Sequence, residues 1–352
     1  MAKAPKKTAA KKAKTTAKKA ASKAAVKDTA AKKATTQAKK AAAKTAAPKK
    51  APTKKAPPKK EGQKKSAAKS VKKVTGYGGG GVDVVMSVDQ VAKEAASIAA
   101  NAPTHKELLK LADNDPLLTI EDLRAGYGKM EILHEFTLEI KKGQSLCLIG
   151  PNGAGKSTVL HSIFGFTNIF SGKISIGGKD VTNLTPSQKL AEAGIAYILQ
   201  DKSVFPQMTV EENLLMGGFL KNKPLEAKAA AEMVFDKYSR LAERRDKPAG
   251  VLSGGERRLL EISRALVMNP EVLLVDEPSI GLEPRFIDMV FEILADLQHR
   301  DGKTIIMVEQ NAKKGLSFAD LGYVLVSGET AIADKGDDLL QNPDVGRLFL
   351  GG

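Results

Sequence analysis

The sequence predicts an α/β domain with a largely parallel core sheet. Three observations support this: apolar segments alternate with helical ones from residue 117 onward, a glycine-rich turn follows one apolar segment, and two carboxylates follow another. Strands that alternate with helices form parallel sheets, because each crossover helix returns the chain to the same end of the sheet. We therefore expect one domain over residues 117–352. The predicted strands lie at 117–123, 132–140, 145–149, 272–275, 304–308 and 323–326, and residues 211–245 have mostly helical character.

The charge of the chain is concentrated in its first part. Residues 1–75 carry 26 lysines against two acids, a net charge of +24, whereas the remainder carries −8. Repulsion between lysines and the near absence of apolar side chains larger than alanine predict a disordered tail, which a glycine-rich joint at 76–81 separates from the rest. Such a tail is either a solvated extension or a non-specific binder of polyanions, namely nucleic acid or anionic lipid. No aromatic side chain lies among the lysines, which argues against stacking on bases.

Residues 82–116 are expected to form a helical linker between the tail and the domain. Ser87 with Gln90, and Thr104 with Glu107, have the spacing of capping boxes at helix starts. We therefore expect three parts, with boundaries after residues 81 and 116.

The composition excludes a disulfide-rich secreted protein and a membrane-spanning one. Cys147 is the only cysteine, so no disulfide can form within the chain. No apolar run approaches the roughly 18–20 residues that cross a bilayer, and the N-terminus lacks the apolar core of a secretory signal. We expect a cytoplasmic protein that reaches a membrane only by docking on a partner.

A phosphate-binding loop is predicted at residues 150–158 (GPNGAGKST), which match the P-loop pattern. Its glycines let backbone N–H groups point at phosphate oxygens, and the positive end of the following helix favours the same anion. Lys156 would supply a charge for the β- and γ-phosphates, and Ser157 a hydroxyl for Mg²⁺. The candidate nucleotide-binding residues here are Gly150, Asn152, Gly153, Ala154, Gly155, Lys156, Ser157 and Thr158.

A pair of carboxylates, Asp276 and Glu277, follows the apolar strand at 272–275 in the Walker B arrangement. Parallel strands deliver such residues to the sheet edge where ligands bind. Asp276 is expected to hold Mg²⁺ through water, and Glu277 to act as the general base that polarises the attacking water. The pair alone could be a solvated turn, but the P-loop in the same chain favours the catalytic interpretation.

A second phosphate site is predicted at residues 252–257 (LSGGER), before an expected helix at 257–267. Backbone N–H groups at a helix N-terminus bind anions. The candidate residues are Ser253, Gly254, Gly255 and Glu256.

With these three motifs in this order, residues 117–352 resemble the nucleotide-binding domains of ABC (ATP-binding cassette) transporters over their full length. The chain is most similar to the second ATPase of branched-chain amino acid importers. The resemblance implies a P-loop NTPase fold of ABC type, with a mostly parallel core sheet, an antiparallel β subdomain and a helical subdomain. The segments that carry the resemblance are 123–129 (LRAGYGK), 205–217 (FPQMTVEENLLMG), 279–284 (SIGLEP), 308–311 (VEQN) and 349–352 (FLGG).

The resemblance also implies partners and residue roles. Two cassettes pair head to tail, so that Ser253 and Gly255 contact the nucleotide of the partner. Tyr127 is expected to stack on adenine. Gln200 is expected to touch Mg²⁺ or water and to report to the membrane subunit. Two membrane permeases and, indirectly, a periplasmic solute-binding protein complete such an importer, which would place the chain on the inner face of the plasma membrane.

Two positions depart from the ABC pattern. Gln310 stands where a switch histidine is usual; its amide can donate a hydrogen bond to a γ-phosphate but, unlike an imidazole, cannot take up a proton near neutral pH. The similar importer ATPases share this glutamine, so Gln310 remains a catalytic candidate. Glu283 stands where many ABC proteins have an aspartate.

The predicted function is therefore ATP hydrolysis, with ATP and Mg²⁺ as cofactors, that energises an importer for branched-chain amino acids or a related small polar solute. The alternative is a soluble ABC ATPase that associates with nucleic acid through its basic tail. The absence of a second cassette from the chain favours the importer.

Overall fold

The computed structural model describes residues 102–200 and 203–350. The predicted tail and joint at 1–81 and most of the predicted linker at 82–116 lie outside these residues. The described part of the linker contains one helix, α3 (His105–Leu111). The Glu107 carboxylate accepts hydrogen bonds from the backbone N–H and the hydroxyl of Thr104, both at 2.8 Å, as the capping-box spacing predicts.

The core sheet has six strands in the order β10-β9-β3-β8-β7-β6. Every neighbouring pair is parallel except β9 and β10, which form an antiparallel hairpin. The strands are β3 (Ser145–Ile149), β6 (Ile195–Ile198), β7 (Val272–Asp276), β8 (Thr304–Val308), β9 (Leu321–Val326) and β10 (Glu329–Lys335). The predicted parallel sheet is confirmed, and β6 and β10 extend it beyond the strands that the sequence predicted.

Alternate side chains of the core strands enter two separate hydrophobic clusters. On β7, Leu274 belongs to one cluster, while Leu273 and Val275 belong to the other. The first cluster packs against helix α4 (Lys156–Phe164) and the second against α10 (Pro284–His299). Both faces of the sheet are therefore covered, which explains why its strands are continuous apolar runs rather than alternating ones.

A second, antiparallel sheet has the order β2-β1-β4-β5. Its strands are β1 (Pro116–Tyr127), β2 (Met130–Lys141), β4 (Asn168–Ile176) and β5 (Lys179–Asp180). The predicted strands at 117–123 and 132–140 are present but longer, because Gly128 and Lys129 form a tight turn that continues the pairing to Tyr127 and Met130. This sheet is the antiparallel β subdomain that the resemblance implies.

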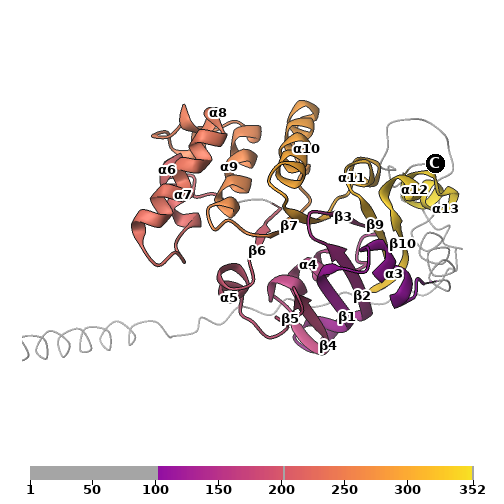
Figure 1. Ribbon diagram of the computed structural model, residues 1–352. Coiled ribbons are helices and arrows are strands. Elements are labelled where there is room, and N and C mark those ends of the chain that lie inside the picture. The colour runs from indigo at the N-terminus through magenta and orange to yellow at the C-terminus, as the bar shows by residue number, and fades with distance from the viewer. Residues whose placement is uncertain (1–101, 201–202, 351–352) are drawn as a thin grey trace, which may run out of the picture. The chain divides into compact units, whose positions relative to one another are not determined.

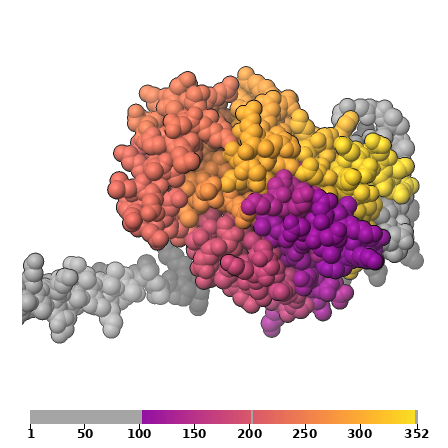
Figure 2. All heavy atoms as spheres, in the orientation of Figure 1, coloured from indigo at the N-terminus to yellow at the C-terminus, as the bar shows by residue number. Residues whose placement is uncertain are grey.

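A helical subdomain has its own apolar cluster. Figure 1 shows its helices gathered together away from β1 and β2, and in Figure 2 the same residues form one lobe beside α10. Its elements are α6 (Val210–Gly217), α7 (Pro224–Lys237), α8 (Ser239–Ala242), the 3₁₀ turn η1 (Ala249–Val251) and α9 (Gly254–Leu266). The helical character predicted for residues 211–245 is confirmed.

The remaining helices connect strands or close the chain. They are α5 (Pro186–Ala191), α11 (Ala312–Phe318), α12 (Gly336–Gln341), α13 (Pro343–Val345) and the π-helical turn η2 (Gly346–Leu350). Within residues 102–200 and 203–350, none of the helices has the length and apolar character needed to cross a membrane.

Candidate functional site

The predicted phosphate loop connects β3 to α4. Gly150 has a φ of +146°, and a Cβ atom there would clash with the backbone carbonyl of Leu325 on β9, so only glycine can occupy this position. Gly155 is left-handed at a φ of +99° and directly precedes α4. The loop therefore turns sharply and aims the N-terminus of α4 at its own concave side, where an anion is favoured.

Lys156, the first residue of α4, points back into the loop. Its ammonium donates hydrogen bonds to the carbonyls of Gly150 at 2.9 Å and Pro151 at 3.0 Å. Burial lowers the pKa of Lys156, and the nearby charges of Glu277 and Asp276 oppose that shift. The lysine is thus a nearly buried cation whose only hydrogen-bond acceptors among the described residues are two neutral carbonyls, an arrangement suited to an incoming anion.

Asp276, at the end of β7, meets the loop from the neighbouring part of the sheet. Its Oδ1 accepts a hydrogen bond from the Ser157 hydroxyl at 3.3 Å, and its Oδ2 accepts one from the Tyr197 hydroxyl at 2.8 Å. Burial, followed by the charge of Asp276, raises the pKa of Tyr197, which keeps its hydroxyl protonated. Two of the three predicted metal residues, Ser157 and Asp276, are therefore adjacent, and Tyr197 is a neighbour that the sequence did not single out.

Glu277 brings together the two predicted glutamines. Its Oε2 accepts hydrogen bonds from Nε2 of Gln200 at 2.7 Å and from Nε2 of Gln310 at 2.8 Å. Its backbone is left-handed, with a φ of +45°, and its N–H donates to the carbonyl of Val308 at 2.9 Å. A non-glycine residue in the left-handed region is strained. The hydrogen bond to β8 and the two glutamine amides stabilise this conformation of Glu277.

A further carboxylate, Glu309, organises this edge of the sheet and was missed by the sequence analysis. It is buried, and it accepts hydrogen bonds from the Ser279 hydroxyl at 2.7 Å and the Asn311 N–H at 3.0 Å. It thereby joins the segment after Glu277 to the segment that carries Gln310. In the sequence Glu309 is an acid after a strand, and such acids are usually solvated. Its position beside Gln310 was the only sign that it belongs to the site.

The second predicted phosphate site lies at the N-terminus of α9. The helix begins at Gly254, three residues before the start predicted from the sequence, because Ser253 and Glu256 form a capping box. The Glu256 carboxylate accepts from the Ser253 N–H and hydroxyl, both at 2.9 Å. Gly255 packs so closely on the Phe286 ring that a Cβ atom would clash with it. Among the described residues, Ser253, Gly254, Gly255 and Glu256 make no hydrogen bond to the phosphate loop.

Tyr127 lies in a group of aromatic rings beside the phosphate loop. Its hydroxyl shares a short hydrogen bond with Nδ1 of His161 on α4. The His161 ring lies 5.8 Å from that of Phe166 and 5.7 Å from that of Tyr197, measured between centroids. Burial lowers the pKa of His161, so the imidazole is neutral at neutral pH. About two fifths of Tyr127 is exposed.

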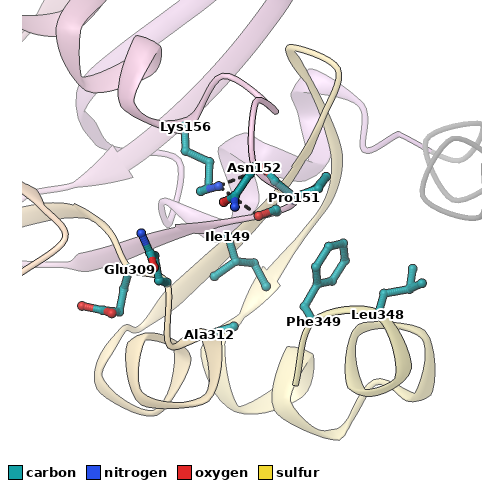
Figure 3. A pocket seen from close by; sticks show the side chains of 10 residues that line it. Ile149, Pro151, Asn152, Lys156, Glu309, Ala312, Leu348 and Phe349 are labelled. Carbon is teal, nitrogen blue, oxygen red and sulfur yellow. Dashed lines mark hydrogen bonds between the residues drawn. The ribbon is translucent and has the colours of Figure 1, made fainter. Parts of the chain in front are cut away.

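A cavity of about 210 Å³ adjoins the phosphate loop. Figure 3 shows Lys156 and Asn152 on one side of it and Leu348 and Phe349 of η2 on the other. Gln310 also lines it. Leu348 and Phe349, near the end of the described residues, therefore form part of the wall of this site.

The fold and these contacts define a P-loop nucleoside triphosphatase. The family model that matches is that of the ABC transporter, over residues 133–280. The chain is 42% identical over 236 residues to the high-affinity branched-chain amino acid transport ATP-binding protein BraG of Pseudomonas aeruginosa, covering 67% of this chain and all of that one. It is 37% identical to the probable branched-chain amino acid transport ATP-binding protein LivF of Archaeoglobus fulgidus, covering 67% and 99% of the two chains.

Other transport proteins are also similar. The lipopolysaccharide export system ATP-binding protein LptB of Haemophilus influenzae is 31% identical over 67% of this chain and 97% of its own. A nucleotide-free ATP-binding cassette from an ABC transporter superposes with a TM-score of 0.60 at 28% identity, over 67% of this chain and all of that one. The chain belongs to the ATP-binding subunit family of ABC transporters and is an ATP hydrolase, which confirms the resemblance found in the sequence.

Proposed function

We propose that this chain is the ATP-hydrolysing subunit of a membrane importer for branched-chain amino acids or a related small polar solute. The observation that supports ATP hydrolysis is the contact at Glu277, where the side chains of Gln200 and Gln310 both donate to one carboxylate oxygen. The likeness to BraG and LivF supports the class of solute, whereas the likeness to LptB, an export protein, makes the direction of transport a matter for experiment.

In the proposed mechanism Glu277 is the general base. Its carboxylate polarises the attacking water and accepts its proton, while Gln200 and Gln310 orient the carboxylate and the γ-phosphate. Lys156 binds the phosphates, and Tyr127 stacks on the adenine. A second cassette completes the site by presenting Ser253 and Gly255 of its α9 N-terminus to the nucleotide.

Magnesium suits the oxygen donors of this site. Mg²⁺ prefers oxygen ligands and is commonly held by one or two protein groups together with substrate phosphates. The Ser157 hydroxyl and the Asp276 carboxylate are within 3.3 Å of each other, and Gln200 lies at the neighbouring Glu277. These three side chains would hold the ion, which would neutralise phosphate charge during hydrolysis.

The membrane role implies permease partners and a peripheral place on the inner face of the plasma membrane. The test uses a strain of the source organism from which the gene for this chain has been deleted. The strain is expected to lose most uptake of radiolabelled leucine, isoleucine or valine, and a plasmid with the wild-type gene, but not one with Glu277→Gln, is expected to restore it. Unchanged uptake of all three amino acids would contradict the proposed solute class.

The alternative, an ATPase that acts on nucleic acid through its basic tail, predicts a different result in the same strain. Uptake would be normal, and ATP hydrolysis by the purified protein would respond to random-sequence DNA. The tail lies outside the described residues, so its charge is the single observation in favour of this alternative.

Gln310→Ala is expected to lower the rate of ATP hydrolysis roughly 10- to 100-fold, which corresponds to the loss of one hydrogen bond to a charged group. Gln310→His restores a donor at the same position and is expected to keep much of the activity. The control is Lys313→Ala, an exposed change three residues away. The measurement is phosphate release at saturating ATP and Mg²⁺; a fully active alanine variant would leave Gln310 only a structural role.

A further inference from the structure

Tyr197 lies between the strand that leads to Gln200 and the carboxylate of Asp276. It belongs to β6, pairs with Leu274 in the register of β6 and β7, and is three residues before Gln200. Its hydroxyl donates to Oδ2 of Asp276 at 2.8 Å, across 79 residues of sequence. A hydrogen bond to an ionised carboxylate is among the stronger ones in proteins and fixes its direction.

The second oxygen of the same carboxylate is directed at the phosphate loop. Oδ1 of Asp276 accepts from the Ser157 hydroxyl at 3.3 Å. A carboxylate that could rotate freely would present either oxygen to this hydroxyl. With Oδ2 held by Tyr197, only Oδ1 faces the place where Ser157 and the phosphates would meet the ion.

The Tyr197 ring is itself held by the first helix of the site. Its centroid lies 5.5 Å from that of Phe164 and 5.7 Å from that of His161, both on α4. The loop ring Phe166 lies 5.9 Å away. The hydroxyl therefore projects from a ring that is packed on the helix carrying Lys156 and Ser157, and its direction is fixed relative to them.

We propose that Tyr197 is a positioning residue for the carboxylate of Asp276: it holds Oδ2, leaves Oδ1 facing Ser157 where Mg²⁺ would be held, and links this orientation to the strand that leads to Gln200. The inference rests on the proposed metal role of Asp276 and deepens it.

The test compares ATP binding with and without Mg²⁺ by calorimetry in the wild-type protein and in Tyr197→Phe. The phenylalanine keeps the ring and removes only the hydroxyl. The gain in ATP affinity on adding Mg²⁺ is expected to fall about tenfold, whereas the affinity without Mg²⁺ stays the same, because losing a hydrogen bond to a charged group changes an equilibrium by at least that factor. The Mg²⁺ concentration for half-maximal hydrolysis is expected to rise by a similar factor.

Two further variants separate the possible outcomes. Tyr238→Phe removes a buried hydroxyl of the helical subdomain that has no hydrogen-bond partner among the described residues, and it is expected to leave the Mg²⁺ effect unchanged. Asp276→Asn is expected to abolish most of it. A normal or larger Mg²⁺ effect in Tyr197→Phe, together with a reduced one in Asp276→Asn, would overturn the role of Tyr197 alone. A normal Mg²⁺ effect in both variants would overturn the metal role of Asp276 as well.

Discussion

A Glu277→Gln variant is expected to bind ATP normally and to hydrolyse it about 10²- to 10⁴-fold more slowly, which is the usual contribution of a general base. The amide oxygen of the new side chain can still accept the hydrogen bonds that Gln200 and Gln310 donate to Glu277. The strained backbone at this residue keeps its bond to Val308, which does not involve the side chain. The change therefore removes the base and leaves the geometry of the site in place.

The measurement pairs phosphate release with equilibrium ATP binding. Glu271→Gln is a matched control, because Glu271 is an acid near the opposite end of the same strand whose partner is the exposed Lys142. This control is expected to hydrolyse ATP at the wild-type rate. If two cassettes close on the nucleotide, the Glu277→Gln protein with ATP and Mg²⁺ is also expected to elute from gel filtration as a dimer. Hydrolysis by Glu277→Gln at the wild-type rate would remove Glu277 from the mechanism.

The sequence predicted those parts of the fold whose chemistry is local. The phosphate loop needs glycines and a lysine at fixed spacing, so its place between β3 and α4 follows from residues 150–158 alone. The core strands β7 and β8 are buried on both faces and therefore appear as continuous apolar runs. Strand β6 was missed, because four residues between helical segments carry too little periodicity and only the pairing with β7 identifies them as a strand.

The parts of the site that were missed depend on tertiary contacts. Tyr197 looks like a core aromatic in the sequence, and only the folded chain brings its hydroxyl to Asp276. Glu309 looks like a solvated acid, whereas in the structure it is 2% exposed and satisfied by Ser279 and Asn311. The start of α9 was predicted three residues too late, because the two glycines after Ser253 are poor helix formers, although Ser253 is the N-cap of the helix.

A Lys156→Ala variant is expected to bind ATP roughly 10- to 100-fold more weakly, because phosphate loses a charged hydrogen-bond donor. In the structure the ammonium donates to the Gly150 and Pro151 carbonyls, and phosphate oxygens would give it acceptors of opposite charge. Lys142→Ala removes the same charge from an exposed position and is expected to bind ATP normally.

The two site variants are expected to differ in kind. Glu277→Gln accumulates bound ATP that it does not cleave, whereas Lys156→Ala leaves the nucleotide in solution. Thermal melting without nucleotide checks that the alanine variant is folded, since the two loop carbonyls lose their donor. ATP added at about ten times the wild-type dissociation constant is then expected to raise the melting temperature of the Glu277→Gln protein, and to raise that of Lys156→Ala much less, because the stabilisation grows with the logarithm of 1 + [ATP]/Kd and the Kd of Lys156→Ala is expected to be roughly 10 to 100 times larger. Equal stabilisation of both variants by ATP would place the phosphates away from Lys156.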